Sequence, residues 1–301
     1  MSARIPISAY GKLPFARDFL RSACSSGAGL GFRDFLDDCA PCFIREHPEA
    51  WQPLRLTLML AEARIVASVW SSADEGGLRP YPFALFSILP GPTSAGGWSH
   101  FAAVFAGHDR AWARCRELPD TKSFDRMFAE GLPIAALEPL PAEPVPLALW
   151  VRSVYGADSE SFALLLWRLE TLGRRPDGIK LPVAAALPLE AQVDAWLGVL
   201  ATAGSGPLLP PGVAVSAPQE GRGSVAHNYR EVSPADLAVL SETATRTTDI
   251  ADLTIPRQPR RLDGFGAFHE RLQALLARPE SRLSDLGRVL SSAEGIEKPC
   301  V

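Results

Sequence analysis

The sequence has no excess of charge of either sign. Its 301 residues carry 30 Lys and Arg against 34 Asp and Glu, a formal net charge of -4. This near balance provides neither a broad basic field for nucleic acid nor a polybasic patch for an anionic membrane. Long apolar runs are also missing, since none approaches the roughly 20 residues of a bilayer-spanning helix. Residues 1–6 lack the apolar core of a secretory signal. We therefore expect a cytoplasmic protein with no nucleic-acid partner and no membrane insertion.

Cysteine is scarce, and its count of five is odd. An extracellular disulfide framework is normally even in number and denser, so we expect reduced thiols. Cys39 and Cys42 form a Cys-x-x-Cys pair, which can be redox-active or can ligate zinc. The pair lies at the end of a helical pattern, and only Cys24 and His47 are near enough in sequence to complete a zinc site. We favour two semi-buried thiols at a helix end broken by Pro41.

Complete catalytic and cofactor motifs are missing as well. Gly11-Lys12 does not begin a phosphate-binding loop, because Leu13 stands where Ser or Thr is required. The glycines of residues 27–31 lack the spacing of a dinucleotide-binding turn. His269 is followed by Gln273 where a zinc protease helix needs a second His. We therefore predict no catalytic residue, no cofactor and no metal, and a protein that is not an enzyme.

The chain length and its proline pattern suggest two domains. A length of 301 residues, of which 47% are hydrophobic, gives each of two domains enough material for a core. Proline alternates with other residues at 138–146, which is typical of a stiff linker. We expect an α/β domain at 1–137, this linker, a second α/β module at 147–245, and a connector with C-terminal helices at 246–301.

Hydrophobic periodicity gives the elements of the first half. Residues 81–89 are almost continuously apolar, which predicts a strand buried on both faces. Residues 30–43 have apolar positions at helical spacing, with acidic residues on the other side. We expect strands at 5–10, 54–60, 65–70 and 81–89, a short helix at 15–20, and longer helices at 30–43, 101–118 and 124–132.

The second half shows an alternating pattern. We expect strands at 147–154, 181–187 and 213–215, with helices between them. Asp158 is predicted to cap the first of these helices. The polar stretch 241–259 is predicted to be a connector, and two amphipathic helices complete the chain.

The most specific pattern consists of two short boxes. The first box reads Gly11-Lys12-Leu13-Pro14 and is followed by Asp18-Phe19, and the second reads Arg79-Pro80-Tyr81-Pro82-Phe83. A helix-like run rich in Phe and Asp lies between them. This order resembles the N-terminal domain of the TagF/ImpM family of bacterial type VI secretion accessory proteins. The family usually shows a Gly-Lys-Leu-Pro box with a nearby Asp-Phe, and then a Gly-Arg-Tyr-Phe-Pro box. Here the second box departs from that pattern, because Leu78 precedes Arg79 and Pro80 is inserted before Tyr81.

The resemblance implies both a fold and a function. The fold is an α/β fold: a three-layer α/β/α N-terminal domain with a mixed sheet, followed here by a second, smaller α/β module and a helical C-terminal tail. Members of the family hold type VI secretion off after translation, through a forkhead-associated scaffold protein. The resemblance therefore implies a non-catalytic regulator whose partners are type VI secretion components.

The resemblance also implies structural or partner-binding roles for box residues, namely Gly11, Lys12, Leu13, Pro14, Asp18, Phe19, Arg79, Tyr81, Pro82 and Phe83. In physical terms, Gly11 permits a tight turn and Pro14 stiffens it. We expect Asp18 to pair with Arg79 or Lys12 where strand ends meet. Replacing Asp18 by Ala should then lower stability more than it alters binding.

Two alternative functions stay open. The protein could be a small-molecule sensor or enzyme that uses a cleft between its two α/β halves, with His227, Asn228 and Tyr229 lining the cleft. It could also be a structural scaffold in which the C-terminal helices dimerise.

Overall fold

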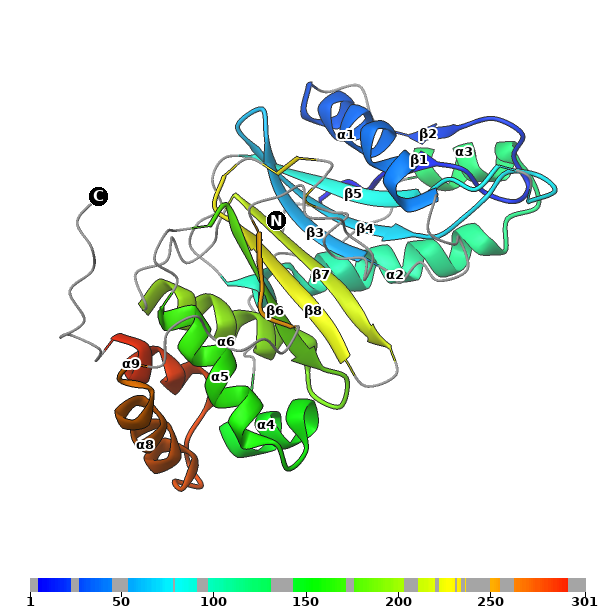
Figure 1. Cartoon of the computed structure of the whole chain (residues 1–301). Helices are drawn as coiled ribbons and strands as arrows, with labels where there is room; N and C mark the ends of the chain where they lie inside the picture. Colours follow the sequence, from blue (N-terminus) through cyan, green and yellow to red (C-terminus); the bar gives the residue numbers. More distant parts are fainter. Residues whose placement is uncertain are drawn as a thin grey trace.

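The structure, a computed structural model, describes residues 5–22, 27–44, 54–77, 79–90, 97–130, 143–171, 176–202, 211–219, 222–230, 232–233, 236, 250–254 and 263–291. Within these ranges one sheet runs through the molecule, with the strand order β2-β1-β5-β4-β3-β7-β8-β6-β9 (Figure 1). Its strands are β1 (Ser8–Gly11), β2 (Leu20–Ser22), β3 (Leu54–Leu60), β4 (Ala63–Trp70), β5 (Phe83–Pro90), β6 (Gly178–Ala184), β7 (Gly212–Gln219), β8 (Arg222–Asn228) and β9 (Ile250–Asp252). All neighbouring pairs are antiparallel except β6 and β9, which are parallel, so the sheet as a whole is mixed. The parallel pair lies in the second half, whereas the mixed sheet was expected in the first half, whose strands are all antiparallel to one another.

The two halves of the chain meet in the middle of this sheet. Strand β3 of the first half pairs with β7 of the second half, from Leu54 opposite Ser216 to Leu58 opposite Gly212. Backbone hydrogen bonds therefore join the halves edge to edge. The division into two domains stays a prediction, because most of the proline-rich segment lies outside the described ranges.

Helices cover both faces of the sheet. On one face, α1 (Gly27–Ile44) packs on β3 and β4. On the other, the short helix η2 (Trp98–Phe101) leads into α2 (Ala102–Arg116), which packs on β4 and β5. Helix α6 (Leu189–Thr202) contacts η2 and β6 and so continues this second layer. Figure 1 shows α1 and α2 on opposite sides of the strands, which confirms the expected α/β/α layering of the first half.

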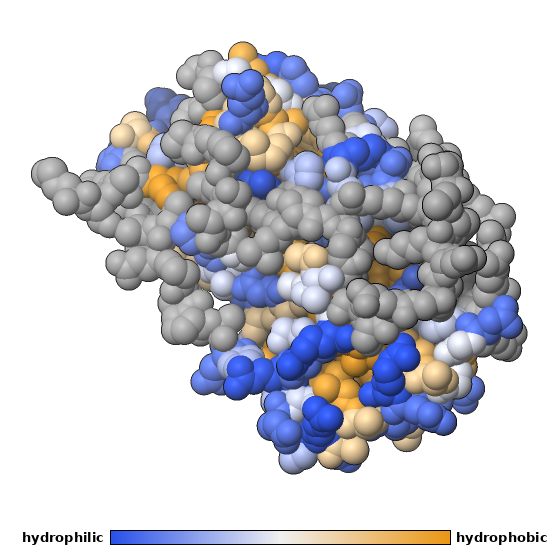
Figure 2. Space-filling model, turned by 90° about the vertical axis from the view of Figure 1, so that its left-hand side faces the viewer, coloured by the Kyte–Doolittle hydropathy of each residue, from blue (hydrophilic) through white to orange (hydrophobic). Residues whose placement is uncertain are grey.

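Further helices pack around this framework. They are α3 (Thr121–Ala129), α4 (Leu147–Tyr155), α5 (Ser159–Glu170), α8 (Phe265–Leu276), the short η3 (Leu283–Asp285) and α9 (Leu286–Ser291). Helices α8 and α9 contact α5 and α6, so the predicted C-terminal helices are present. Figure 2 views this side of the molecule, where apolar patches alternate with hydrophilic residues. Whether the C-terminal helices dimerise stays a hypothesis.

None of the helices in the described ranges has the length and apolar character needed to cross a bilayer.

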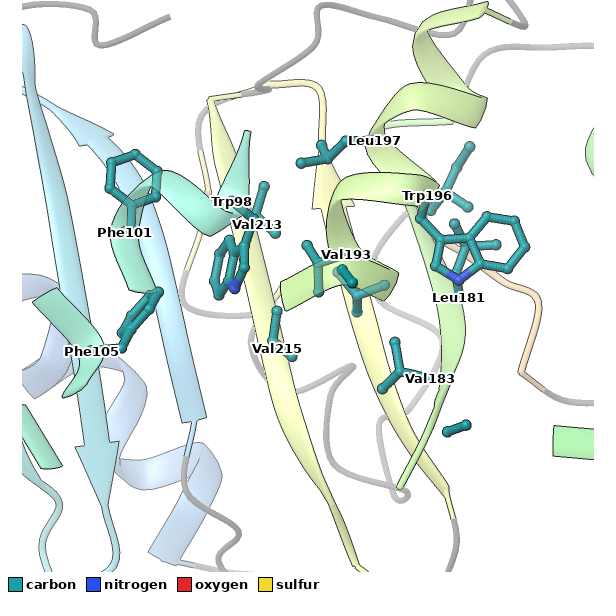
Figure 3. Close-up of a cluster of buried hydrophobic side chains, with 14 of the residues drawn as sticks. Trp98, Phe101, Phe105, Leu181, Val183, Val193, Trp196, Leu197, Val213 and Val215 are labelled. Atoms are coloured by element: carbon teal, nitrogen blue, oxygen red, sulfur yellow. The ribbon is translucent and has the colours of Figure 1, made fainter. Parts of the chain in front are cut away.

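Alternation along β3 divides the core between the two faces. Leu54, Leu56 and Leu58 point toward α1 and join a buried cluster with Phe32 and Phe86. The intervening side chains face α2 and α6, where the larger cluster lies; Figure 3 shows part of it, including Trp98, Phe105, Val193, Trp196 and Val213. Period-two alternation of this kind places a strand between two helical layers.

An ion-pair network links the helices of the two halves above β3. The Arg55 guanidinium lies 2.9 Å from Asp109 Oδ2 on α2 and 3.1 Å from Glu190 Oε1 on α6. It also lies over the ring of Phe105, at 5.3 Å from the ring centre. Arg55 thus adds a polar contact to the strand pairing that joins the halves.

The strand expected at 147–154 is wrong, because these residues form α4. Leu147, Trp150, Val151 and Val154 are buried, and they fall at the three- and four-residue spacing of one helix face. The apolar run was too short for its period to distinguish helix from strand. The short helix expected at 15–20 is also wrong, since these residues form turns that lead into β2.

Strands β8 and β9, like the short β2, had no counterpart among the predicted strands. Strand β8 reads Arg-Gly-Ser-Val-Ala-His-Asn and has little apolar alternation, but it is hydrogen-bonded on both sides, to β6 and β7. Strand β9 lies inside 241–259, which was predicted to be a connector, and pairs with β6. By contrast, the cap at Asp158 is confirmed, because its Oδ1 accepts a hydrogen bond from the Ser161 backbone N–H at 2.9 Å.

Candidate partner-binding site

The two boxes lie side by side at the ends of neighbouring strands. Strand β1 ends at Gly11, which is opposite Phe83 at the start of β5. Gly11 has a φ of +134°, and a Cβ added to it would lie 2.1 Å from the Pro82 carbonyl oxygen. No other residue type tolerates both the dihedral angle and the approach. Gly11 is therefore what allows the first box to lie against the second.

A buried ion pair fixes the turn after Gly11. Lys12 Nζ lies 3.2 Å from Asp74 Oδ2, and both side chains are 7% exposed. The same ammonium lies over the Phe19 ring, 5.1 Å from its centre. Asp74 Oδ1 accepts a hydrogen bond from the Arg79 backbone N–H at 2.9 Å. One carboxylate thus joins Lys12 of the first box to Arg79 of the second.

The expectation that Asp18 pairs with Arg79 or Lys12 is wrong. Asp18 is exposed, and the partner of both residues is Asp74. Asp74 lies in the connection between β4 and β5, outside either box. The sequence does carry a signal for this role, because Asp74 lies in a polar stretch between two predicted strands, and turn aspartates often accept backbone N–H groups.

The electrostatic surroundings of Asp74 favour its charged form. Burial alone would raise the pKa of this carboxyl, but the Arg79 backbone N–H and the Lys12 ammonium outweigh that effect and hold the pKa below its ordinary value. The carboxylate and the ammonium are therefore a closed pair, with neither group available as a free acid or base.

Aromatic side chains form the other part of the site. Phe19 stacks on Tyr10, with ring centres 5.5 Å apart, and meets Tyr81 edge-on at 4.6 Å. The hydroxyls of Tyr10 and Tyr81 both donate to Asp37 Oδ1 of α1, at 2.7 and 2.5 Å. Burial and this carboxylate raise the pKa of both tyrosines. The arrangement ties α1 to the two boxes, and Asp37 is a second member of the site that lies outside them.

The loops that carry the boxes are hydrogen-bonded to each other. The Glu75 backbone N–H donates to the Ala16 carbonyl at 3.2 Å and so joins the two loops, and the Tyr81 N–H donates to the Ser72 carbonyl at 3.0 Å within the second loop. The exposed side chains on these loops include Pro14, Arg17, Asp18, Glu75 and Arg79, a set that we call the box surface. The Arg79 side chain is 75% exposed, and its Nε lies 3.8 Å from Asp74 Oδ2.

The box residues thus divide into two groups by burial. Gly11, Lys12, Leu13, Tyr81, Pro82 and Phe83 are buried and hold the fold together, and Phe19 is half-buried. Pro14, Asp18 and Arg79 are exposed and are available to another molecule. The box surface carries both signs of charge, which suits a protein partner better than a polyanion.

The residues proposed for a ligand cleft or a zinc site lie away from the two boxes. His227 and Asn228 are buried in β8, inside the sheet, and Tyr229 follows them. Cys39 is a fully buried residue of α1, and the expected break at Pro41 is wrong because the helix continues to Ile44. The side chain of Cys42 and both other zinc candidates lie outside the described residues. Among the side chains that the structure describes, no three His, Cys, Asp or Glu residues gather as metal ligands would.

A serine–histidine contact lies in the core of the first half. His108 of α2 is fully buried; its Nδ1 lies 3.2 Å from Ser68 Oγ, and its Nε2 lies 3.3 Å from Ser87 Oγ. Both ring nitrogens are therefore engaged by core hydroxyls that a substrate does not reach. Burial, with a smaller effect of the Arg55 charge, lowers the pKa of His108 to about 3.

The buried histidines predict acid sensitivity. The folded pKa of about 3 at both His108 and His227 lies below the unfolded value of about 6.5. Between these limits the unfolded state binds protons that the folded state excludes. The stability that depends on the neutral histidines is therefore fully present above about pH 6.5 and is lost as the pH drops. Each histidine contributes about 1.4 kcal/mol per pH unit. Urea midpoints between pH 7.5 and 4 should show a shallower dependence in His108→Asn; an unchanged slope would contradict the assignment.

Comparison with known proteins assigns no family to this chain. No family model matches the chain, and the search of curated proteins found no match. Among solved structures, the crystal structure of PA0076 from Pseudomonas aeruginosa PAO1 is similar over 47% of this chain and 68% of that protein, with 18% identity and a TM-score of 0.33. A likeness at this level does not bear on function.

Proposed function

We propose that the protein is a non-catalytic, cytoplasmic accessory protein of bacterial type VI secretion, which represses the apparatus after translation by binding a forkhead-associated scaffold protein. The observation that carries the proposal is the union of the two boxes. Gly11 and Phe83 are paired residues of adjacent strands, and Asp74 binds Lys12 of one box and Arg79 of the other. The sequence resemblance to the TagF/ImpM family rests on these same boxes.

The chemistry of the site supports binding in preference to catalysis. The Lys12 ammonium and the Asp74 carboxylate are buried and neutralise each other. The exposed members are charged side chains on short, hydrogen-bonded loops, and such loops present a fixed surface to a partner. Arg79 is the strongest candidate contact, because exposed arginines are frequent in the energetic centres of protein interfaces.

The test is capture of the partner by charge-reversed variants. Tagged wild-type protein, Arg79→Glu and Arg116→Glu should each be used to recover partners from a lysate of the native host, with identification by mass spectrometry. Arg116 is the matched control, because it is an exposed arginine of the same half, on α2. We expect Arg79→Glu to lower scaffold recovery on the order of tenfold, with an unchanged melting temperature, because its exposed ion pair contributes little stability.

The outcomes separate the hypotheses. Recovery of a forkhead-associated scaffold by wild type and by Arg116→Glu, but not by Arg79→Glu, supports the proposed function and the box surface together. Recovery that is equal for all three proteins keeps the partner and removes the box surface. A wild-type preparation without any type VI component, at comparable expression, overturns the function.

A further inference from the structure

Among the described residues, two fully buried tryptophans have paired indole nitrogens and a third, Trp98, does not. Trp150 Nε1 donates to Gln192 Oε1 at 2.9 Å, and Trp196 Nε1 donates to the Pro182 carbonyl at 3.0 Å. Trp98 is equally buried, yet its Nε1 has no hydrogen-bond partner among the residues that the structure describes. Its position is firmly held, because the Asp194 carboxylate of α6 accepts from the backbone N–H groups of Trp98 and Ser99. A rigidly placed donor is therefore aimed into the core.

The buried imidazoles show the same contrast. Both ring nitrogens of His108 lie beside serine hydroxyls, whereas in the described part of the chain neither nitrogen of His227 has a partner. Burial lowers the pKa of His227 to about 3, so the ring is neutral near pH 7. A neutral imidazole has one donor nitrogen and one acceptor nitrogen. His227 thus brings both kinds of hydrogen-bonding group into the core.

A third polar group of this kind lies on the same face of the sheet. Thr57 Oγ1 is buried, and the described residues offer it no partner. Thr57 is opposite Val213 in the sheet, and Val213 is opposite His227, so the two polar side chains lie one strand to either side of Val213. Figure 3 draws the Trp98 ring next to Val213, and both belong to the same buried cluster. The three groups therefore surround one valine.

Their spacing suits a bridging molecule. Neighbouring strands lie about 4.8 Å apart, so the backbones of Thr57 and His227 are separated by about 10 Å. Two hydrogen bonds to one water span roughly 5.6 Å, and a chain of two waters spans more, so ordered water can bridge polar side chains at this strand separation. More than nine in ten buried polar groups in proteins are paired, and a buried water typically takes about three such groups as partners.

We propose that Thr57, Trp98 and His227 form an internal hydration site that holds ordered water above Val213, at the seam where β3 of the first half meets β7 of the second. The water accepts from the Trp98 indole and exchanges hydrogen bonds with the threonine hydroxyl and the imidazole. Because its ligands come from β3, from η2 and from β8, it links the two halves of the sheet in addition to the strand pairing and the Arg55 network.

A crystal structure of the wild-type protein, at a resolution that resolves waters, tests the site directly. We expect a density peak within hydrogen-bonding distance of at least two of the three groups. The indole nitrogens of Trp150 and Trp196 are internal controls, and no water should lie on them, because protein atoms already accept from them. Absence of a peak at Thr57, Trp98 and His227 overturns the proposal.

The variant Thr57→Val gives an independent test, because the expected change in stability has opposite signs for a hydroxyl that binds water and for an unpaired hydroxyl. Valine has nearly the shape of threonine, so the change removes the hydroxyl and leaves the packing in place. A hydroxyl that binds water is stabilising, and its loss should lower the folding equilibrium constant roughly three- to tenfold in urea titrations. An unpaired hydroxyl is destabilising, so an unfolding midpoint equal to or above that of wild type overturns the proposal. Ser87→Ala serves as a control for the loss of a buried hydroxyl whose partners lie within the protein.

Discussion

Replacing Gly11 by Ala should strongly destabilise the folded state. The added Cβ would lie 2.1 Å from the Pro82 carbonyl oxygen and 2.7 Å from the Phe83 Cα, both backbone atoms of the neighbouring strand. Relief would require β1 and β5 to separate, and the φ of +134° is strained for alanine in any case. We expect a loss of at least about 3 kcal/mol in the free energy of unfolding. Thermal and urea unfolding of the purified variant measure this loss.

Gly31 provides a matched control for the same substitution. It lies within α1, where an added Cβ meets no atom within 4 Å. Gly31→Ala should therefore be neutral or should stabilise by about 0.5–1 kcal/mol, because alanine loses less conformational entropy in a helix. If Gly11→Ala unfolds at the same temperature as Gly31→Ala, the close approach of the two boxes is wrong.

Replacing Asp74 by Ala should have the second-largest effect. The change leaves the Lys12 ammonium in a site where its side chain is 7% exposed, and it also removes the acceptor of the Arg79 backbone N–H. Breaking one partner of a buried ion pair is far more damaging than removing both. We expect the melting temperature to fall by on the order of 10 °C, as measured by calorimetry. Because the pKa of Asp74 is lowered in the folded state, its contribution is present above pH 4 and is lost as the pH falls below that value.

Two further variants distinguish the contribution of the ion pair to stability from a general effect of changing the loop. Asp18→Ala, which removes an exposed carboxylate from the same site, should change the melting temperature by less than about 2 °C. The double variant Lys12→Met, Asp74→Leu removes both charges and should recover much of the loss caused by Asp74→Ala. A double variant as unstable as Asp74→Ala would show that the backbone contact to Arg79, and not the ion pair, carries the stability.

The helices and strands of the first half could be predicted from the sequence because their hydrophobic patterns are long. Residues 54–60 alternate or are continuously apolar and form β3 with the predicted bounds, and the Phe- and Asp-rich run forms α1. The predictions for short segments were wrong. Residues 147–154 gave an ambiguous period and form α4, while β8 owes its extended shape to two flanking strands. Tertiary pairing overrides weak local preference in such segments.

The candidate site divides in the same way. Gly11, Lys12, Tyr81 and Phe83 were identified from the order of the boxes, and Gly11 was expected to permit a tight turn. Asp74 and Asp37, which bind Lys12 and the two tyrosines, were missed. An aspartate in a turn and an aspartate on the polar side of a helix look like ordinary solvated residues in a sequence.

The sequence by itself therefore determined the α/β class, most of the first half and the membership of the two boxes, because each depends on contacts between near neighbours or on the limits of single residue types. Only the tertiary structure decided that the halves share one sheet through β3 and β7, and that Asp74 joins the boxes. It also decided that Thr57 and His227 face the same valine. These relations join residues tens to hundreds of positions apart, and no local preference records which distant strand or charge will be the partner.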